Sequence, residues 1–178
     1  MRILPRSFYC RNTAIVARQL LGKYLIRKIG RRKLIGKIVE TEAYFENDPA
    51  SHAYRGKTPR SAPMFEHPGH AYVYFIYGNH YCLNAVTERF GKAGAVLIRA
   101  LEPIKGIKAS TNGPGKLTKV LRIDKRFNRA DLTRGNLIIT VGKHEKFAVV
   151  TTKRIGISKA SSKQYRYYIK GNPQVSKT

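Results

Sequence analysis

Acidic residues are scarce in this sequence. Its 178 residues include 10 Asp and Glu against 35 Lys and Arg, which gives a formal net charge of +25. A charge of this size governs association rather than fold, and it predicts a polyanionic partner, for which nucleic acid fits best. An anionic membrane surface fits less well, because no long basic amphipathic helix is evident.

Cysteine is also rare, and long apolar runs are missing. Cys10 and Cys82 are the only two cysteines, and neither belongs to a Cys-x-x-Cys motif. The sequence therefore predicts neither a disulfide framework nor a zinc site, and it favours a reducing compartment. No run of about 18 apolar residues could span a bilayer, and the first residues lack a signal-peptide core. We therefore expect an intracellular protein of the cytoplasm and nucleoid, with no membrane contact.

Length and periodicity predict one globular domain. A hydrophobic content of 42% suits a single domain over residues 1–178, with residues 172–178 as a frayed tail. Asn12 is a suitable N-cap for a helix over residues 13–21. A short helix is expected through Leu121. Strands are predicted over residues 23–29, 34–44, 95–101, 136–141, 146–152 and 165–169, and on both sides of a turn within residues 71–86.

The few acids are clustered. Four of the ten, Glu40, Glu42, Glu46 and Asp48, fall within nine residues. Alternation along the strand predicted over residues 34–44 places Glu40, Glu42 and Tyr44 on one face. These carboxylates either pair with basic neighbours for structural reasons, or one of them is a general base beside an aromatic platform in a basic groove.

Two further segments have features of a nucleic-acid site. Residues 45–68 lack regular periodicity, and such a long loop favours a functional role; it carries His52, Thr58 and Arg60. Farther on, Gly78-Asn79 predicts a two-residue hairpin turn with Tyr77 at its tip. The alternative is that the tyrosines of residues 72–81 belong to an ordinary β core.

Arg99 interrupts the apolar strand predicted over residues 95–101, which Glu102-Pro103 is expected to end. An unpaired guanidinium is very costly to bury, so Arg99 needs an acceptor. Glu40 and Glu42 are the candidates.

The motifs favour metal-free chemistry. The His-x-Glu and Pro-Cys-x-x-Cys signature of the zinc deaminases is missing, so we expect no metal and no cofactor, and a carboxylate that activates water. Reaching a base inside a duplex requires flipping it out, at a cost of about a few kcal/mol. Stacking on aromatic rings returns roughly 1–3 kcal/mol per base. A wedge must fill the gap in the stack, and Tyr77 is placed to do so.

Several motifs together resemble one family. They are VETEAY (39–44), His52, Met64-Phe65, YVY (72–74), IYG (76–78), Asn84, LIRALEP (97–103), GPGKL (113–117) and RIGI (154–157). In this order and at closely similar spacing they resemble the alkyladenine (3-methyladenine) DNA glycosylase family over nearly the whole chain. The implied fold is α+β: a single mixed domain around a curved antiparallel β-sheet, with peripheral helices and a protruding β-hairpin.

The resemblance implies a monofunctional base-excision repair enzyme. It would hydrolyse the N-glycosidic bond of flipped-out damaged purines such as 3-methyladenine and 7-methylguanine, and leave an abasic site in an uncut strand. Hypoxanthine and ethenoadenine are open as further substrates. The implied partner is double-stranded DNA containing damaged bases, and we expect a monomer with no obligate protein partner.

The resemblance also implies residue roles. Glu42 would be the general base for the attacking water, which Arg99 and the backbone carbonyl of Ile155 help to hold. The flipped base would lie between Tyr44 and His52 on one side and Tyr74 on the other. Further roles would fall to Asn84, against the minor-groove edge of the purine, to Tyr77, as the intercalating side chain, and to Thr58, Arg60, Asn79, His80 and Gly156, as DNA-binding residues.

Two segments depart from the family pattern. Members often carry tryptophan or proline where this chain has SSKQY (161–165), and this sequence has no tryptophan. The Asn79-His80 flank of the expected wedge is more polar than in some relatives. The alternative function is a non-catalytic, basic nucleic-acid-binding protein. The acids at 40–48 argue against it, because a pure phosphate binder gains nothing from negative charge in its groove.

Overall fold

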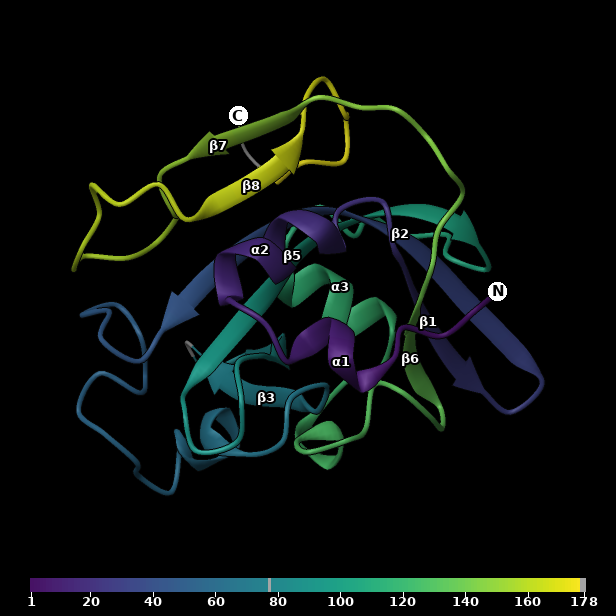
Figure 1. The fold of residues 1–178 in the computed structure, drawn as a ribbon. Coiled ribbons are helices and arrows are strands. Elements are labelled where there is room, and N and C mark those ends of the chain that lie inside the picture. Colours follow the sequence, from purple (N-terminus) through teal and green to yellow (C-terminus); the bar gives the residue numbers. More distant parts are fainter. Residues whose placement is uncertain (77, 177–178) are drawn as a thin grey trace.

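The computed structural model describes residues 1–76 and 78–176. Eight strands form one antiparallel sheet, in which β3, β4, β5, β2, β1 and β6 follow one another and β8 joins β2 to β7 (Figure 1). The helices and strands are α1 Arg6–Tyr9, α2 Thr13–Leu20, β1 Tyr24–Ile29, β2 Arg32–Phe45, β3 Ala71–Ile76, β4 His80–Val86, β5 Gly94–Lys105, α3 Pro114–Val120, β6 Leu137–Thr140, β7 Val149–Thr152 and β8 Arg166–Ile169; the 3₁₀ helices η1 Ala62–Phe65 and η2 Lys125–Phe127 complete them. The predicted α+β class, a single mixed domain around a curved antiparallel sheet, is confirmed.

The long strand β2 is the centre of the sheet. One of its edges pairs with β5 along most of its length. Its other edge is divided, because residues 32–37 pair with β1 and residues 40–42 pair with β8. Residues 40–42 therefore have a strand on each side, and their side chains meet those of both neighbours.

Helix α2 covers the core face of this strand. The Asn12 side chain caps the helix by accepting hydrogen bonds from the backbone N–H groups of Ala14 and Ile15. Val16, Ala17 and Leu20 are buried in the main hydrophobic core. The Thr41 hydroxyl donates to the Ala17 carbonyl at 2.9 Å, which fixes the helix over β2. The helix predicted over residues 13–21 is confirmed and ends one residue earlier.

Two local predictions are wrong. Strand β5 does not end at Glu102-Pro103 but continues to Lys105, because Pro103 lies opposite Gly36 at an irregularity in the β2–β5 register, where no ladder N–H is required. The β3–β4 connection is longer than two residues: Ile76 pairs with His80, which leaves three residues between the strands. Tyr77, the expected wedge, lies outside the described residues.

The predicted frayed tail is wrong for residues 172–176. The Asn172 side chain donates to Glu102 at 2.6 Å, Val175 is buried, and Ser176 hydrogen-bonds to Glu40. Residues 177 and 178 lie outside the described part of the chain. Among the helices of the described residues, none has the length and apolarity to cross a bilayer.

Gly94, at the start of β5, allows a close approach between segments. A Cβ there would lie 2.5 Å from Thr13 Oγ1 and 2.6 Å from Glu88 Cγ, two side chains that hydrogen-bond to each other in the interior. We expect Gly94→Ala to lower the free energy of unfolding by about 1–3 kcal/mol, as overpacking does.

Urea unfolding measures this effect. Gly113→Ala is the matched control, because a Cβ there meets nothing closer than 3.9 Å. Its free energy of unfolding should stay within about 0.5 kcal/mol of wild type. Equal stability of the Gly94 and Gly113 variants would contradict the close packing.

Candidate active site

A pair of register shifts brings two acids of β2 and Arg99 of β5 together. In the β2–β5 pairing, Ile38 lies opposite Leu101 and Glu40 lies opposite Ala100. The next residue of β2, Thr41, lies opposite Ile98, so Arg99 is the extra residue on β5. Bulges of this kind redirect side chains and are common beside active sites. Here the bulge places the Arg99 guanidinium against both carboxylates.

Glu42 is fully buried and has three partners. Its Oε1 accepts a hydrogen bond from the backbone N–H of Ile155 at 2.9 Å and lies 3.3 Å from Arg99 Nη1. Its Oε2 accepts from the Tyr44 hydroxyl at 2.8 Å. The expected pairing of Arg99 with the acids of β2 is thus confirmed, and Glu40 Oε1 also lies 3.3 Å from Arg99 Nε.

The electrostatics of this group keep Arg99 charged. Burial alone lowers the pKa of Arg99, but Glu42 and Glu40 together outweigh burial and raise it above its ordinary value. Burial and the Glu42 carboxylate likewise raise the pKa of Tyr44. Tyr44 therefore remains a hydroxyl donor at neutral pH. Within the described part of the chain, no group of three His, Cys, Asp or Glu side chains is placed to hold a metal ion.

A cavity of about 520 Å³ lies beside the charged group. All three partners of Glu42 line it, and Glu42 itself lies behind them. Its other walls come from the β3–β4 hairpin, the turn at residues 113–116 and the loop at residues 155–157. His80 and Gly156, two of the expected DNA-binding residues, are among these lining residues.

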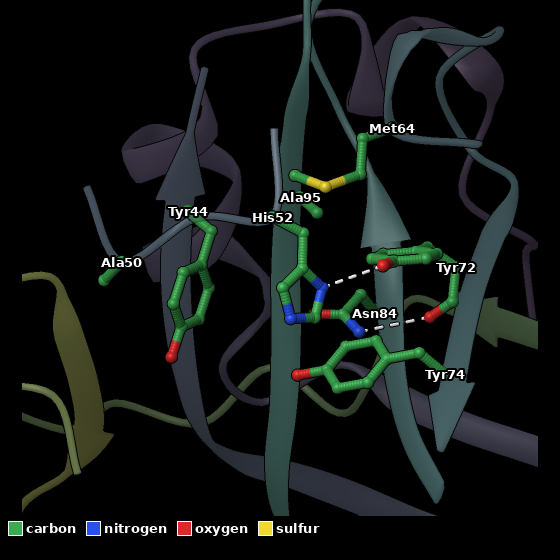
Figure 2. Close-up of a pocket in the computed structure, with 8 residues that line it drawn as sticks. All are labelled: Tyr44, Ala50, His52, Met64, Tyr72, Tyr74, Asn84 and Ala95. Atoms are coloured by element: carbon green, nitrogen blue, oxygen red, sulfur yellow. Dashed lines mark hydrogen bonds between the residues drawn. The ribbon is translucent and has the colours of Figure 1, made fainter. Parts of the chain in front are cut away.

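A smaller recess of about 30 Å³ adjoins the cavity and is enclosed by aromatic rings (Figure 2). Such a volume holds about one water molecule. The two spaces share Tyr44, Ala50, His52 and Tyr74, and the recess adds Met64, Tyr72, Asn84 and Ala95. The structure therefore brings together all four residues expected to contact the base.

The rings of this recess are close-packed. The centroids of His52 and Tyr74 are 4.6 Å apart with their planes at 76°, whereas a base stacked between two rings needs about 7 Å, twice a van der Waals spacing. In the view of Figure 2, Tyr44 and Tyr74 lie on opposite sides of His52. A base could enter between His52 and Tyr74 only after one ring turns.

Hydrogen bonds fix the polar side chains of the recess. His52 Nδ1 lies 2.8 Å from the Tyr72 hydroxyl, and the Asn84 amide donates to the Tyr72 carbonyl at 3.1 Å. Burial, and then the charge of Arg60, lower the pKa of His52 to about 4. Burial raises the pKa of Tyr72 to about 12. At neutral pH both the imidazole and the phenol are therefore uncharged.

The other predicted DNA-binding residues within the described part of the chain, Thr58, Arg60 and Asn79, do not line the cavity. The Arg60 guanidinium is 5.5 Å from the centroid of the Tyr74 ring, within cation–π range. Thr58 shares a hydrogen bond of 3.0 Å with Ser61, which holds this part of the loop together. Asn79 is exposed at the end of the hairpin. Both Arg60 and Thr58 are exposed.

The sequence prediction missed a second buried ion pair. Arg154 and Asp48 form a bidentate pair, and Arg154 Nη1 also donates to the Ala43 carbonyl at 3.0 Å. The guanidinium lies 4.6 Å from the centroid of Tyr44. This pair ties the loop before His52 to the loop that carries Ile155. The scarcity of acids was the available signal, because each acid of a strongly basic chain is a candidate partner for a buried arginine.

Comparison with known proteins supports the same assignment. The family model of methylpurine-DNA glycosylase (MPG) matches residues 7–173. The chain belongs to this family. The resemblance found in the sequence is thereby confirmed.

Relatives are similar over their full length. A protein of Carboxydothermus hydrogenoformans is 53% identical over 190 residues, covering 98% of this chain and 99% of that protein. One of Legionella pneumophila (strain Corby) is 48% identical, with both chains covered completely. One of Clostridium acetobutylicum is 44% identical and covers 97% of each chain. All three carry the name "Putative 3-methyladenine DNA glycosylase".

The charge of Arg60 leads to a prediction about the pKa of His52. We expect Arg60→Gln to raise the pKa of His52 part of the way from about 4 towards 6.5, because burial, the larger cause, persists. NMR titration of the imidazole measures this pKa. Arg55→Gln, which removes a charge from an exposed position of the same loop, should leave the pKa of His52 unchanged.

The same shift has a consequence for stability. Because the folded pKa of His52 lies below 6.5, the unfolded chain binds more protons between those two values. His52 therefore lowers stability as the pH falls from 6.5 towards 4. A His52→Gln variant should lose less stability than wild type over that range, and an equal loss in both proteins would contradict the lowered pKa.

Proposed function

We propose that this protein is a monofunctional DNA glycosylase that hydrolyses the N-glycosidic bond of flipped-out damaged purines with a water activated by Glu42. The observation that carries the proposal is the position of Glu42. It is buried directly behind Tyr44, Arg99 and Ile155, which line a cavity with aromatic walls in a protein of charge +25. The relatives are named for 3-methyladenine, and the family supports a DNA glycosylase.

The cavity suits a purine taken out of the stack. A volume of about 520 Å³ accommodates a base together with part of its sugar. Stacking on Tyr44, His52 and Tyr74 would contribute roughly 1–3 kcal/mol and offset the cost of flipping. The contact between His52 and Tyr74 implies that the base opens its own slot on entry. Asn84, which lines the recess, would then face an edge of the purine.

The proposed hydrolysis needs a general base that accepts a proton from water, and little further catalysis. Purines alkylated at N3 or N7 carry positive charge and leave readily, and aromatic faces attract cations. Glu42 would take the proton of the water, while Arg99 and the backbone carbonyl of Ile155 hold the water against the sugar. In the free protein both carboxylate oxygens of Glu42 accept hydrogen bonds, one from the Tyr44 hydroxyl and one from the Ile155 N–H. Water would reach the carboxylate when the incoming nucleotide shifts one of these donors.

The surface around the cavity would bind the duplex. Thr58, Arg60, Asn79, His80 and Gly156 would contact the DNA, and Tyr77 would fill the gap left by the base. Phosphate contacts of this kind make affinity fall steeply with salt. We propose that the protein acts as a monomer on chromosomal DNA in the nucleoid, without an obligate protein partner. It would leave an abasic site and an intact strand.

A non-catalytic nucleic-acid-binding protein is the competing function. A net charge of +25 would suit such a protein equally well. The arrangement of Glu42 would not, because burying a carboxylate behind an aromatic cavity does nothing for phosphate binding.

The decisive experiment is Glu42→Gln. Release of 3-methyladenine and 7-methylguanine from methylated duplex DNA should fall by about 10³-fold or more, since the amide can accept no proton from water. Alkali converts each abasic site to a strand break, which gels quantify. DNA binding should stay close to wild type, because glutamine keeps the size of the side chain and an oxygen for the Ile155 N–H.

Glu66→Gln is the matched control. Glu66 is a surface acid paired with Arg129, and its loss should leave base release unchanged. Wild-type rates in the Glu42 variant would remove Glu42 as the general base. Absence of alkali-labile sites with the wild-type protein would instead favour the non-catalytic alternative.

Tyr77→Ser tests the wedge. Replacing the ring by a hydroxymethyl group should weaken binding to lesion-containing duplex more than binding to single-stranded DNA, because only a duplex has a stack to fill. Fluorescence anisotropy with matched oligonucleotides measures both affinities. An equal loss on the two DNAs would exclude the wedge role.

A further inference from the structure

We infer that the C-terminal segment belongs to the catalytic assembly, with Ser176 as a positioning residue that keeps Arg99 directed at Glu42. The inference rests on the function proposed above. It starts from Glu40, a second fully buried carboxylate on the same face of β2 as Glu42. Glu40 does not line the cavity, yet it contacts the arginine that does.

Glu40 receives its hydrogen bonds from the last part of the chain. Its Oε2 accepts from the backbone N–H of Ser176 at 2.7 Å, and its Oε1 lies 3.0 Å from the Ser176 hydroxyl. Arg166 of β8 donates through Nε to Oε1 at 2.7 Å. The tail and the final strand thus supply the donors that a buried carboxylate requires.

Arg99 is shared between the two carboxylates. Its Nε lies 3.3 Å from Glu40 Oε1 but without hydrogen-bond geometry, while its Nη1 lies 3.3 Å from Glu42 Oε1. One guanidinium therefore lies between two acceptors of equal charge and equal distance. The other donors on Glu40 determine how strongly that acid competes for it.

Ser176 sets this balance. With its two donors in place, Glu40 has hydrogen bonds on both oxygens and leaves Arg99 oriented towards Glu42. Without them, each oxygen of Glu40 would lose a donor, Oε1 the hydroxyl and Oε2 the N–H. A buried acceptor that has lost a donor draws in the nearest available cation. Arg99 would then turn towards Glu40 and away from the cavity, where it is needed to hold the water.

The tail is built to present Ser176. The Asn172 side chain bonds to Glu102, its oxygen accepts from the Gln174 N–H at 2.9 Å, and Val175 is buried beside them. These contacts anchor the turn immediately before Ser176. The donors of Ser176 therefore reach a carboxylate two residues along β2 from Glu42.

The test compares three tail variants in single-turnover release of 7-methylguanine from duplex DNA. Ser176→Ala removes the hydroxyl, and its rate should fall about tenfold, since hydrogen bonds to charged groups are the strong ones. Ser176→Pro removes both the hydroxyl and the N–H, and the rate should fall about 100-fold. Ser176→Thr retains both donors and should restore the wild-type rate.

Gln174→Ala is the matched control, because the hydrogen bond to Asn172 comes from the backbone N–H of Gln174 and not from its side chain. Its rate and its DNA affinity should equal those of wild type. DNA affinity should also be unchanged in Ser176→Ala, and the signal of the Arg99 Nε–H group in NMR spectra should shift in Ser176→Ala but not in Ser176→Thr.

Two results would overturn the inference. One is a wild-type rate in Ser176→Ala or in Ser176→Pro. The other is a loss of rate that follows a fall in melting temperature and that threonine does not restore, since this indicates a structural role alone. A wild-type protein that releases no base overturns the proposed function itself, so the two failures are distinguishable.

Discussion

The site depends on one arginine placed between two buried carboxylates. Glu40 and Glu42 share a face of β2, and both are completely shielded from solvent. Burying two like charges on one face of a strand is very costly unless opposite charges compensate them. Arg99 from β5 and Arg166 from β8 supply these opposite charges, so the charges of the group balance. Three strands must be correctly paired before any of these groups has its partner.

This requirement explains the irregular pairing of the sheet. A regular ladder between β2 and β5 would give Arg99 a place in the alternation opposite one residue of β2. The two register shifts release it from that alternation and let it contact both acids. The Arg154–Asp48 pair also positions a partner of Glu42. It connects the loop before His52 to the loop that carries Ile155, whose N–H donates to Glu42. A local irregularity and buried ion pairs thus position the residues that surround Glu42.

Sequence reasoning reached the family, the sheet and the main acid–arginine pairing. Those features follow from local pattern: alternation, clustered acids, and a buried arginine that needs an acceptor. It failed where contacts between residues distant in the sequence determine the local structure. Pro103 continues β5 because of what lies opposite it, and residues 172–176 are ordered because Glu40 and Glu102 accept their hydrogen bonds. The contact between His52 and Tyr74 depends on packing between a loop and a strand, which no periodicity encodes.

The pairing of Glu40 also bears on how the protein folds. The hydrogen bonds of Glu40 join residues that are 126 and 136 positions apart. Contacts between such distant residues close large loops, and the entropy of that closure is lost before the contacts stabilise anything. The group around Glu40 and Arg99 is therefore expected to form late in folding, after the hairpins of the sheet, whose contacts are local.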